Sequence, residues 1–398
     1  MQNITIAQNV ILVVVDGARY TETFGADDPS LLIPYLYNDL MPQGTLYSNF
    51  YNVGKTRTNS GHSTLLTGTW QNIANNGTER PTQPTVFEYF RKEDSSSLLE
   101  NFVIAGKSKL NILTYSTDSL YGSAYMASDT SDDLTDDEVY LNLTSTMDTY
   151  NPKLIIVNFP DVDNAGHSGD WDDYLDAITN VDSLIFKLWN KIQNDSYYQN
   201  NTTLFITNDH GRHSYDFTEH GDDCEGCQHI MLLALGERIS AETIVSDTLY
   251  QVDIAPTIGN LMSFSTPNAT GSILPIQLEI DINVYLEGPY NNDTMSSAIY
   301  SYIPLAQPFS TSPWNYSGSE EVSEIPENVV DWVLVELRND MNVQSETIRA
   351  VFLLSSGKIV DTDGYSSLSF TASPNDYYIV VKHRNHLPIM SNSAITIN

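Results

Sequence analysis

Long hydrophobic runs are absent from this sequence: no stretch of transmembrane length occurs among its 398 residues, although 41% of them are hydrophobic and 11% are aromatic. That composition is ample for globular packing. We therefore expect a soluble protein with no transmembrane segment. The length exceeds what one hydrophobic core usually serves, so we also expect one large domain and a smaller one.

Basic residues are scarce. Lysine and arginine number 18 against 51 acidic residues, which gives a formal net charge of -33 at pH 7. A surface this acidic argues against a nucleic-acid duplex or an anionic membrane as partner. It would also repel an anionic substrate at long range, so a phosphate site here needs local cations, and a bound metal ion would supply them.

Cysteine is nearly missing as well. The two that occur, Cys224 and Cys227, stand in "CEGC". This spacing is found in redox pairs, but no βαβ opening surrounds it. A disulfide that closes a local loop, or two inert thiols, is therefore favoured. Their redox state is left open. The amino terminus, "MQNITIAQNVILVVVDGARY", has no basic n-region, so we expect a strand there and not a signal peptide.

Three apolar runs rich in β-branched residues each reach a carboxylate. "VILVVVDG" ends at Asp16, "KLIIVNFPDVD" reaches Asp163, and "TLFITNDHG" reaches Asp209. Continuous apolar runs are typical of strands buried on both faces of a parallel sheet. Stretches with helical spacing, such as "WDDYLDAITNVDSLIFKLWNKIQ", lie between them. We predict an α/β fold, a mostly parallel central sheet flanked by helices, with its site at the carboxyl ends of the strands.

The pattern changes near residue 275. Turn-punctuated β runs such as "IRAVFLLSSGKIVDTDG" follow, after a polar stretch rich in proline and serine. We predict a catalytic α/β domain over residues 1–275 and a C-terminal β-rich, sandwich-like domain over residues 276–398.

Histidine is also rare, yet three of the eight fall in "LFITNDHGRHSYDFTEHGDD". Asp163 and His167 form another pair in "PDVDNAGHSGDW", where Gly166 would let the chain bend so that they converge. Alone, such a pair is more often a turn acid and a surface histidine. Three acids at neighbouring strand ends, with histidines beside them, need cations between them, and paired zinc ions suit this mixture of ligands.

Thr58, in "KTRTNSGHSTLLTG", is a candidate nucleophile. A lone threonine just before a helix is usually an N-cap. The same place would let a metal-bound hydroxyl attack phosphorus while the helix N–H groups receive an anionic group. Lys55 and Arg57 stand beside it, in a chain where bases are scarce.

Several motifs occur in the order found in the alkaline phosphatase superfamily: "VVVDGAR", "TNSGHSTLLTG", "DVDNAGH", "TNDHG", "EHGDD" and "VDIAPTIGNLM". They most resemble its threonine-nucleophile branches, the nucleotide pyrophosphatase/phosphodiesterases and the threonine-type alkaline phosphatases. The resemblance covers roughly the first two-thirds of the chain, and several motifs in register are more specific than any one.

The resemblance implies a site with two Zn²⁺ ions, an additional Mg²⁺ being an open alternative. The first zinc ion is expected on Asp16, Thr58, Asp209 and His210. The second is expected on Asp163, His167 and a later histidine, for which we choose His220. The rival for that last position is His229, whose plain interpretation is a satisfied histidine at a strand start.

The resemblance also implies a contact between Asn76 and a phosphoryl oxygen. Asn75 is the register alternative, and a turn residue is the plain interpretation. Arg57 would hold phosphoryl oxygens as well. His62 and His213 match no metal position, and we expect them to support the site or to face solvent.

Residues that are missing argue against two related activities. No cysteine or serine occupies the nucleophile position, as a sulfatase would need for formylglycine, and the Asp-Ser pair of the best-known bacterial alkaline phosphatases is absent. The C-terminal part resembles β-rich modules on secreted bacterial proteins, with "KHRNH" expected as a solvated strand end. We therefore expect a periplasmic or extracellular protein whose leader is absent from this chain.

We predict a phosphoric ester hydrolase that cleaves phosphate monoesters, as an alkaline phosphatase does, through a phosphothreonine on Thr58. Lys55 and Arg57 favour a monoester dianion over a diester. The alternative is a phosphodiesterase or nucleotide pyrophosphatase with the same site, and the rival from another class is a non-catalytic secreted binding protein. The expected partner is a small phosphorylated substrate, and the oligomeric state is left open.

Overall fold

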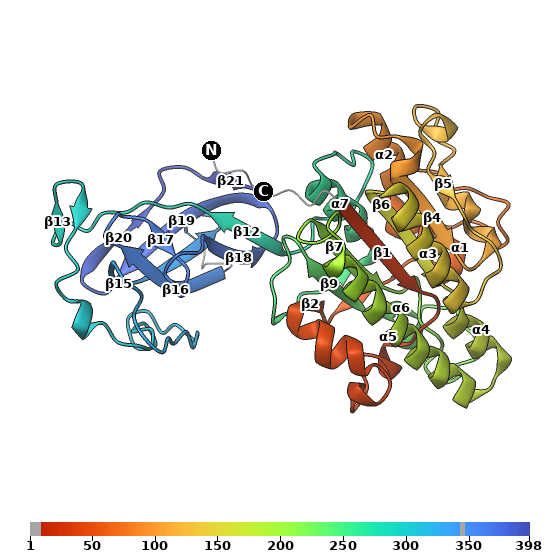
Figure 1. Ribbon diagram of the computed structural model, residues 1–398, viewed down its shortest axis with the longest axis horizontal. Coiled ribbons are helices and arrows are strands. Elements are labelled where there is room, and N and C mark those ends of the chain that lie inside the picture. The colour runs from red at the N-terminus through yellow and green to blue at the C-terminus, as the bar shows by residue number, and fades with distance from the viewer. Residues whose placement is uncertain (1–8, 343–346) are drawn as a thin grey trace. The chain divides into compact units, whose positions relative to one another are not determined.

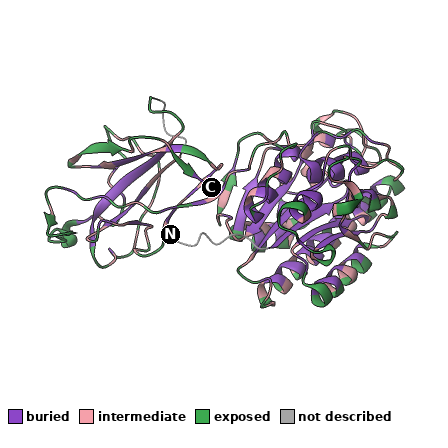
Figure 2. Ribbon diagram, turned by 90° about the horizontal axis from the view of Figure 1, so that it is seen from above, coloured by how far each residue is buried: buried purple, intermediate pink, exposed green. Residues whose placement is uncertain are grey.

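The structure of this protein is a computed structural model that describes residues 9–342 and 347–398 (Figure 1). The chain forms two compact units, Met1–Leu274 and Pro275–Asn398. Among the described helices, none has the length and apolar character that a membrane crossing requires. In both units the long central strands are buried, while exposed residues gather in loops, on outer helix faces and on some short strands (Figure 2).

An eight-stranded sheet forms the centre of the first unit, in the order β10-β2-β9-β7-β1-β6-β4-β5. Every neighbouring pair is parallel except those of β9, which is antiparallel to β2 and to β7. The predicted mostly parallel sheet is thus confirmed. Its strands are β1 (Asn9–Val15), β2 (Gly44–Tyr47), β4 (Asn101–Ala105), β5 (Ser128–Asp129), β6 (Leu154–Phe159), β7 (Thr202–Thr207), β9 (Leu232–Gly236) and β10 (Thr243–Val245).

Helices cover both faces of this sheet. Strand β1 is buried at every residue, and Ile11, Val13 and Val15 share one core with helices α3 (Asp136–Tyr150) and α5 (Trp171–Asn194). Alternate residues of a strand face opposite sides, so Val10 and Leu12 face the other layer. That layer holds helices α1 (Thr58–Thr67), α2 (Val86–Glu93) and α7 (Ile254–Met262), which contact one another, with α7 against β1.

Smaller elements complete the unit. A three-stranded sheet joins β11 (Leu249–Tyr250), β3 (Phe50–Tyr51) and β8 (His229–Ile230). Two short helices follow strands of the main sheet in the chain, α4 (Asp161–Ser168) after β6 and α6 (Glu225–Gln228) after β7.

The register of β1, β6 and β7 decides where the predicted acids lie. Val15 pairs with Phe159 and Val14 with Thr207, so the three strands end at one edge of the sheet. Asp16 follows β1 directly, Asp209 comes just after β7, and Asp163 stands in the first turn of α4. Parallel pairing therefore brings three carboxylates to one edge.

The second unit is built of antiparallel sheets, which confirms the predicted C-terminal β-rich region. Its main sheet has the order β17-β16-β15-β19-β20, with β21 also paired to β19, and its core gathers around Trp332 and Phe352. The strands are β12 (Ile276–Ile280), β13 (Tyr290–Asn291), β14 (Thr294–Met295), β15 (Val329–Arg338), β16 (Thr347–Leu354), β17 (Ile359–Val360), β18 (Leu368–Ala372), β19 (Asn375–His383), β20 (His386–Met390) and β21 (Ile395–Ile397).

One expectation for this unit is wrong. His383, in "KHRNH", was expected at a solvated strand end, but it is buried. Its Nε2 lies 3.1 Å from Asp331 Oδ2, and its Nδ1 lies 3.0 Å from Nδ1 of His386. The buried Asp331 carboxylate, which Arg384 also contacts, is the reason why the imidazole turns inward.

Candidate functional site

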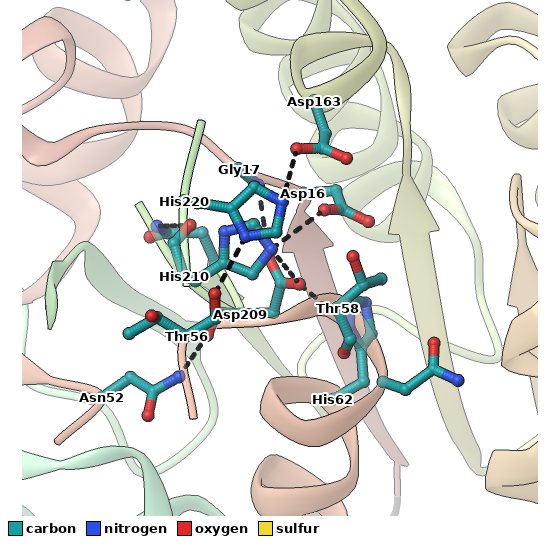
Figure 3. A network of polar contacts seen from close by, with 12 residues as sticks. Asp16, Gly17, Asn52, Thr56, Thr58, His62, Asp163, Asp209, His210 and His220 are labelled. Atoms are coloured by element: carbon teal, nitrogen blue, oxygen red, sulfur yellow. Dashed lines mark hydrogen bonds and ion pairs between the residues drawn. The ribbon is translucent and has the colours of Figure 1, made fainter. Parts of the chain in front are cut away.

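Three carboxylates meet where β1, β6 and β7 end (Figure 3). Asp16 and Asp209 are fully buried, and Asp163 is nearly so. Like charges this close repel one another unless a cation lies between them. Lys107 supplies one, since its Nζ lies 2.8 Å from Asp16 Oδ2 and 2.5 Å from Asp163 Oδ2. Burial alone would lower the pKa of Lys107, but the two carboxylates raise it above its usual value.

Sequence reasoning missed Lys107. It stands in "NFVIAGKSK", just after β4, and β4 pairs in parallel with β6. Its strand therefore ends at the same edge of the sheet as those of the three acids. The signal that could find it is a fourth apolar run, which ends in a lysine where the others end in a carboxylate.

Asp16, Asp209 and His210 turn unpartnered atoms toward one another. The protein holds one oxygen of each carboxylate: Asp209 Oδ1 accepts from Gly17 N at 3.3 Å, and Asp16 Oδ2 accepts from Asn158 Nδ2 at 3.2 Å. The other two oxygens lie 3.3 Å and 3.6 Å from His210 Nε2. All three atoms are buried and have no hydrogen-bond partner among the described residues.

His210 is oriented as a metal ligand is. Its Nδ1 lies 2.9 Å from the carbonyl oxygen of Gly211, which can only accept, so Nδ1 carries the proton and Nε2 presents a lone pair. Burial lowers the pKa of His210 to about 3, which keeps the ring neutral. A lone pair that faces two carboxylate oxygens is repelled by them, so these residues fit a divalent metal ion between them.

A second group shares this centre. Ligand atoms of Asp163, His210 and His220 all lie within 4.8 Å of one another, and His167 Nε2 is 3.5 Å from Asp163 Oδ1. The rings of His210 and His220 are stacked with their centroids 3.9 Å apart. His220 Nδ1 lies 2.9 Å from the Thr56 carbonyl oxygen, which leaves Nε2 facing Asp163 Oδ1 at 3.7 Å. The structure thus brings together the residues expected for a second ion.

Asp163 and His167 converge for a different reason from the one predicted. Both lie in helix α4, where residues four apart share a face, so no bend at Gly166 is needed. Gly166 instead leaves room for Arg212, because a Cβ there would lie 2.3 Å from Arg212 Cζ. The buried guanidinium donates to Asp163 Oδ1 at 2.5 Å. Lys107 and Arg212 together outweigh burial and hold the pKa of Asp163 far below its usual value.

Gly166→Ala is expected to destabilise the first unit by about 2 kcal/mol, because the added methyl group would force Arg212 away from Asp163 in a packed interior. Urea denaturation followed by tryptophan fluorescence would measure the loss. Asn164→Ala is the matched control, since Asn164 is exposed on the same helix and its replacement should leave the free energy of unfolding almost unchanged. Equal stability of the Gly166→Ala variant and the parent would contradict the packing argument.

His229 lies away from this centre. Its ring stacks on Tyr20 and on Tyr51, with centroids 3.8 Å and 4.6 Å apart, and its Nε2 contacts the Ser48 carbonyl oxygen at 3.0 Å. It is therefore a satisfied histidine at a strand start. The geometry favours His220 over His229 as the later ligand.

His62 joins the first group, although no ligand role was expected of it. It is fully buried, with Nδ1 at 3.3 Å from Asp209 Oδ2 and Nε2 at 3.1 Å from Asn158 Nδ2. Burial opposes its protonation, but the charges of Asp209 and Asp16 outweigh burial and raise the pKa of His62. His62 Nδ1 hydrogen-bonds to the Thr58 carbonyl oxygen at 2.8 Å, so the ring lies beside Asp209 without forming a hydrogen bond to its Oδ2. His213 lies in a separate cluster, 3.3 Å from Asp222.

Thr58 is the first residue of helix α1 and lies beside Asp16 and Asp209 (Figure 3). The N-cap is the extended residue Arg57, so the plain interpretation of Thr58 as an N-cap does not hold. Gly61 lets the helix approach the end of β7, because a Cβ there would lie 2.6 Å from the Asp209 carbonyl oxygen. Tight packing of α1 therefore places a buried hydroxyl beside these carboxylates.

The structure favours Asn75 over the predicted Asn76 as a residue facing this helix end. Asn76 is exposed, and its Oδ1 accepts from Thr78 N at 3.1 Å and from Thr78 Oγ1 at 2.7 Å, as a turn residue does. Asn75 Oδ1 instead accepts from Asn59 N at 2.9 Å, in the first turn of α1. The choice of Asn76 is corrected by one residue, because the turn conformation decides which side chain points inward.

Comparison with known proteins agrees with metal chemistry. The family model described as the Metalloenzyme superfamily matches residues 81–265. This span includes Asp163, Asp209 and the histidines of the second group, and it begins after Thr58.

Among curated proteins, this chain is similar to 2,3-bisphosphoglycerate-independent phosphoglycerate mutases. The protein from Gracilaria tenuistipitata var. liui is 32% identical over 123 residues, which are 30% of this chain and 23% of that protein. The protein from Desulforudis audaxviator is 28% identical over 129 residues, again 30% of this chain and 23% of the relative. The chain thus spans about 23% of the length of these relatives.

Among solved structures, a phosphonate monoester hydrolase from Silicibacter pomeroyi and a 2-O GAG sulfatase each give a TM-score of 0.51 at 14% identity. Each match covers 67% of this chain, with 76% of the hydrolase and 73% of the sulfatase. A likeness at this identity concerns the fold, and the fold is alkaline phosphatase-like.

Proposed function

We propose that this protein hydrolyses phosphate monoesters through a phosphothreonine on Thr58. The family match and the fold both support a place in the metalloenzyme superfamily. One observation carries the proposal. Buried, unpartnered ligand atoms of Asp16, Asp209 and His210 converge beside the first residue of helix α1. A hydroxyl nucleophile, a helix N-terminus and metal ligands together supply what phosphoryl transfer through a covalent intermediate requires.

The metal ions are proposed to be zinc, because carboxylate and imidazole ligands suit it. Bound at this centre, the ions would lower the pKa of the Thr58 hydroxyl and stabilise the oxygen that leaves. The residues that would hold the first ion are Asp16, Thr58, Asp209 and His210. Those that would hold the second are Asp163, His167 and His220.

The chain's own groups would bind the phosphoryl oxygens. The first N–H groups of α1 have no intrahelical partners and point out of the helix end. Asn75 anchors its oxygen on one of them, Asn59 N, which leaves its amide nitrogen as a donor to an anion at the same place. Lys107 lies just after β4, and the half-buried Lys109 lies in the 3₁₀ helix Ser108–Thr114 that follows. A Cβ at Gly77 would lie 3.1 Å from Lys109 Cα. The segment that holds Asn75 and Gly77 and the segment that holds Lys107 and Lys109 therefore lie next to each other.

The reaction follows from these positions as two displacements. Thr58 Oγ1 gives up its proton and forms a bond to phosphorus as the bond to the ester oxygen breaks, and that oxygen takes up a proton and leaves as the alcohol. Water then attacks the phosphothreonine, the bond from Thr58 to phosphorus breaks, and Thr58 recovers its proton as phosphate is released. The buried cations Lys107 and Arg212 keep Asp163 ionised throughout, so the ligand set stays intact.

The test compares a nitrophenyl phosphate monoester with the bis-nitrophenyl diester, with zinc removed by chelation and then restored. We expect zinc-dependent turnover and a monoester preference of about tenfold or more, or about 1.4 kcal/mol in the transition state. Diester preference would assign a phosphodiesterase with the same site. No zinc-dependent turnover of either substrate would favour a binding protein instead.

Phosphoryl transfer to a second hydroxyl is another candidate function, favoured by the 32% identity to a phosphoglycerate mutase over 123 residues. A mutase would convert 3-phosphoglycerate into its 2-phosphate isomer without releasing phosphate, whereas the proposed hydrolase would release phosphate. Phosphorus NMR of both products distinguishes the two. The contribution of Arg57, which is exposed and lies near Gly221, is measured in the same assay with Arg57→Ala.

A further inference from the structure

A second cluster of metal-ligating side chains lies on the segment between β7 and β8, apart from the centre described above. Ligand atoms of His213, Asp222 and Cys227 all lie within 4.8 Å of one another, with His213 Nε2 at 3.3 Å from Asp222 Oδ2. Cys224 lies next to this group, and its backbone N–H donates to Asp222 Oδ1 at 3.0 Å. Both cysteines are free thiols. Three potential ligands therefore lie together, and Cys224 stands next to them as a fourth candidate.

His213 shows what this cluster lacks. Its Nε2 is buried and has no hydrogen-bond partner among the described residues, although a carboxylate oxygen lies 3.3 Å away. A buried polar atom in that situation costs free energy, and an ion bound between His213 Nε2 and Asp222 Oδ2 would remove that cost.

The local backbone places both thiols for this task. Cys224 is the N-cap of the short helix α6, and Cys227 N donates to the Cys224 carbonyl oxygen at 3.0 Å, which closes one turn between the two cysteines. Two cysteines at this spacing, a histidine and one carboxylate form a four-ligand set suited to tetrahedral zinc. Thiolate ligands also select against calcium and magnesium, which prefer oxygen.

A redox role fits the pair poorly. Cys227 is fully buried, whereas a reactive cysteine is accessible to solvent. In this setting a thiolate forms when a metal ion replaces its proton.

We propose that His213, Asp222, Cys224 and Cys227 bind a structural zinc ion. The segment that carries them has little regular structure, and its described ties to the rest of the unit include Arg19 Nη1 to the His213 carbonyl oxygen at 3.0 Å and Thr56 Oγ1 to the Asp222 carbonyl oxygen at 2.7 Å. The zinc ion would close the loop from His213 to Asp222. That loop contains His220, so the ion would also hold a proposed ligand of the catalytic centre in place. This second role rests on the proposed function, whereas the structural zinc site itself does not.

Cobalt substitution of the whole protein tests the site without relying on activity. The zinc is exchanged for Co²⁺ under reducing conditions, and the near-ultraviolet thiolate-to-cobalt charge-transfer band is recorded. The catalytic centre holds only oxygen and nitrogen ligands, so this band can come only from Cys224 and Cys227. We expect the band in the parent protein, and we expect the double variant Cys224→Ser, Cys227→Ser to lose both the band and one equivalent of zinc in elemental analysis.

Asp209→Asn is the matched control, because it alters the catalytic centre and should leave the band intact. The parent spectrum needs no variant, so the proposal stays testable even if the serine variant fails to fold. Absence of the band in the cobalt-loaded parent would overturn the proposal, whatever the activity. A disulfide between Cys224 and Cys227 in the protein as purified, seen by non-reducing mass spectrometry, would overturn it as well.

Discussion

Replacement of Thr58 by alanine is expected to abolish phosphate ester turnover, with a loss in kcat on the order of 10⁴-fold to 10⁶-fold. Thr58 presents a buried hydroxyl at the start of α1, beside Asp16 and Asp209. Without that oxygen no covalent intermediate forms, while the aspartate and histidine ligands remain in place. Steady-state release of nitrophenol and the metal content of the same samples would measure both consequences.

Two variants separate chemistry from packing in this experiment. Thr58→Ser keeps the hydroxyl and should retain measurable turnover. Thr67→Ala removes a buried hydroxyl that donates to Ser63 O at 2.8 Å, about 13 Å farther along the same helix, so it should cost about 1 kcal/mol of stability and leave kcat unchanged. Rapid quenching followed by mass spectrometry should find phosphate on Thr58. Full turnover by Thr58→Ala, or phosphate trapped on another residue, would refute the nucleophile assignment.

The central sheet and the meeting of three acids were predictable because parallel strands impose one geometry. Strands buried on both faces have continuous apolar runs, and their carboxyl ends share an edge, so acids that follow such runs meet there. The pairing of Val15 with Phe159 and of Val14 with Thr207 realises this arrangement. No side-chain detail was needed for it.

Features that depend on neighbours in space were not predictable from the chain. Lys107 and Arg212 reach Asp163 from loops distant in sequence; Lys107 at least follows a fourth apolar run, but the residues around Arg212 give no sign of this contact. Which of Asn75 and Asn76 points toward helix α1 depends on the conformation of one turn, and residue spacing alone does not specify that conformation. The sequence also did not predict helix α4, which brings Asp163 and His167 together without the expected bend at Gly166. A short helix directly after a strand leaves little periodic signal in the sequence.

Replacement of Lys107 by methionine should move two measurements in opposite directions. The ammonium group now neutralises Asp16 and Asp163, so a metal ion on these residues must compete with it. Its removal should tighten metal binding by about tenfold, or about 1.4 kcal/mol. Once ions hold the carboxylates, we expect the ammonium group of Lys107 to contact the phosphoryl oxygens, so kcat at saturating metal should fall by about 10²-fold to 10³-fold.

The opposition between these two effects makes the experiment decisive about the role of Lys107. A lysine that only balances charge would give tighter metal binding and normal turnover, whereas a lysine that only supports the ligands would give weaker metal binding together with lower turnover. Lys153→Met is the matched control, because Lys153 pairs with Glu100 at 2.8 Å on the surface and should change neither quantity. Tighter metal binding combined with slower turnover is the result expected only if one ammonium group serves the carboxylates before the ions bind and the substrate afterwards.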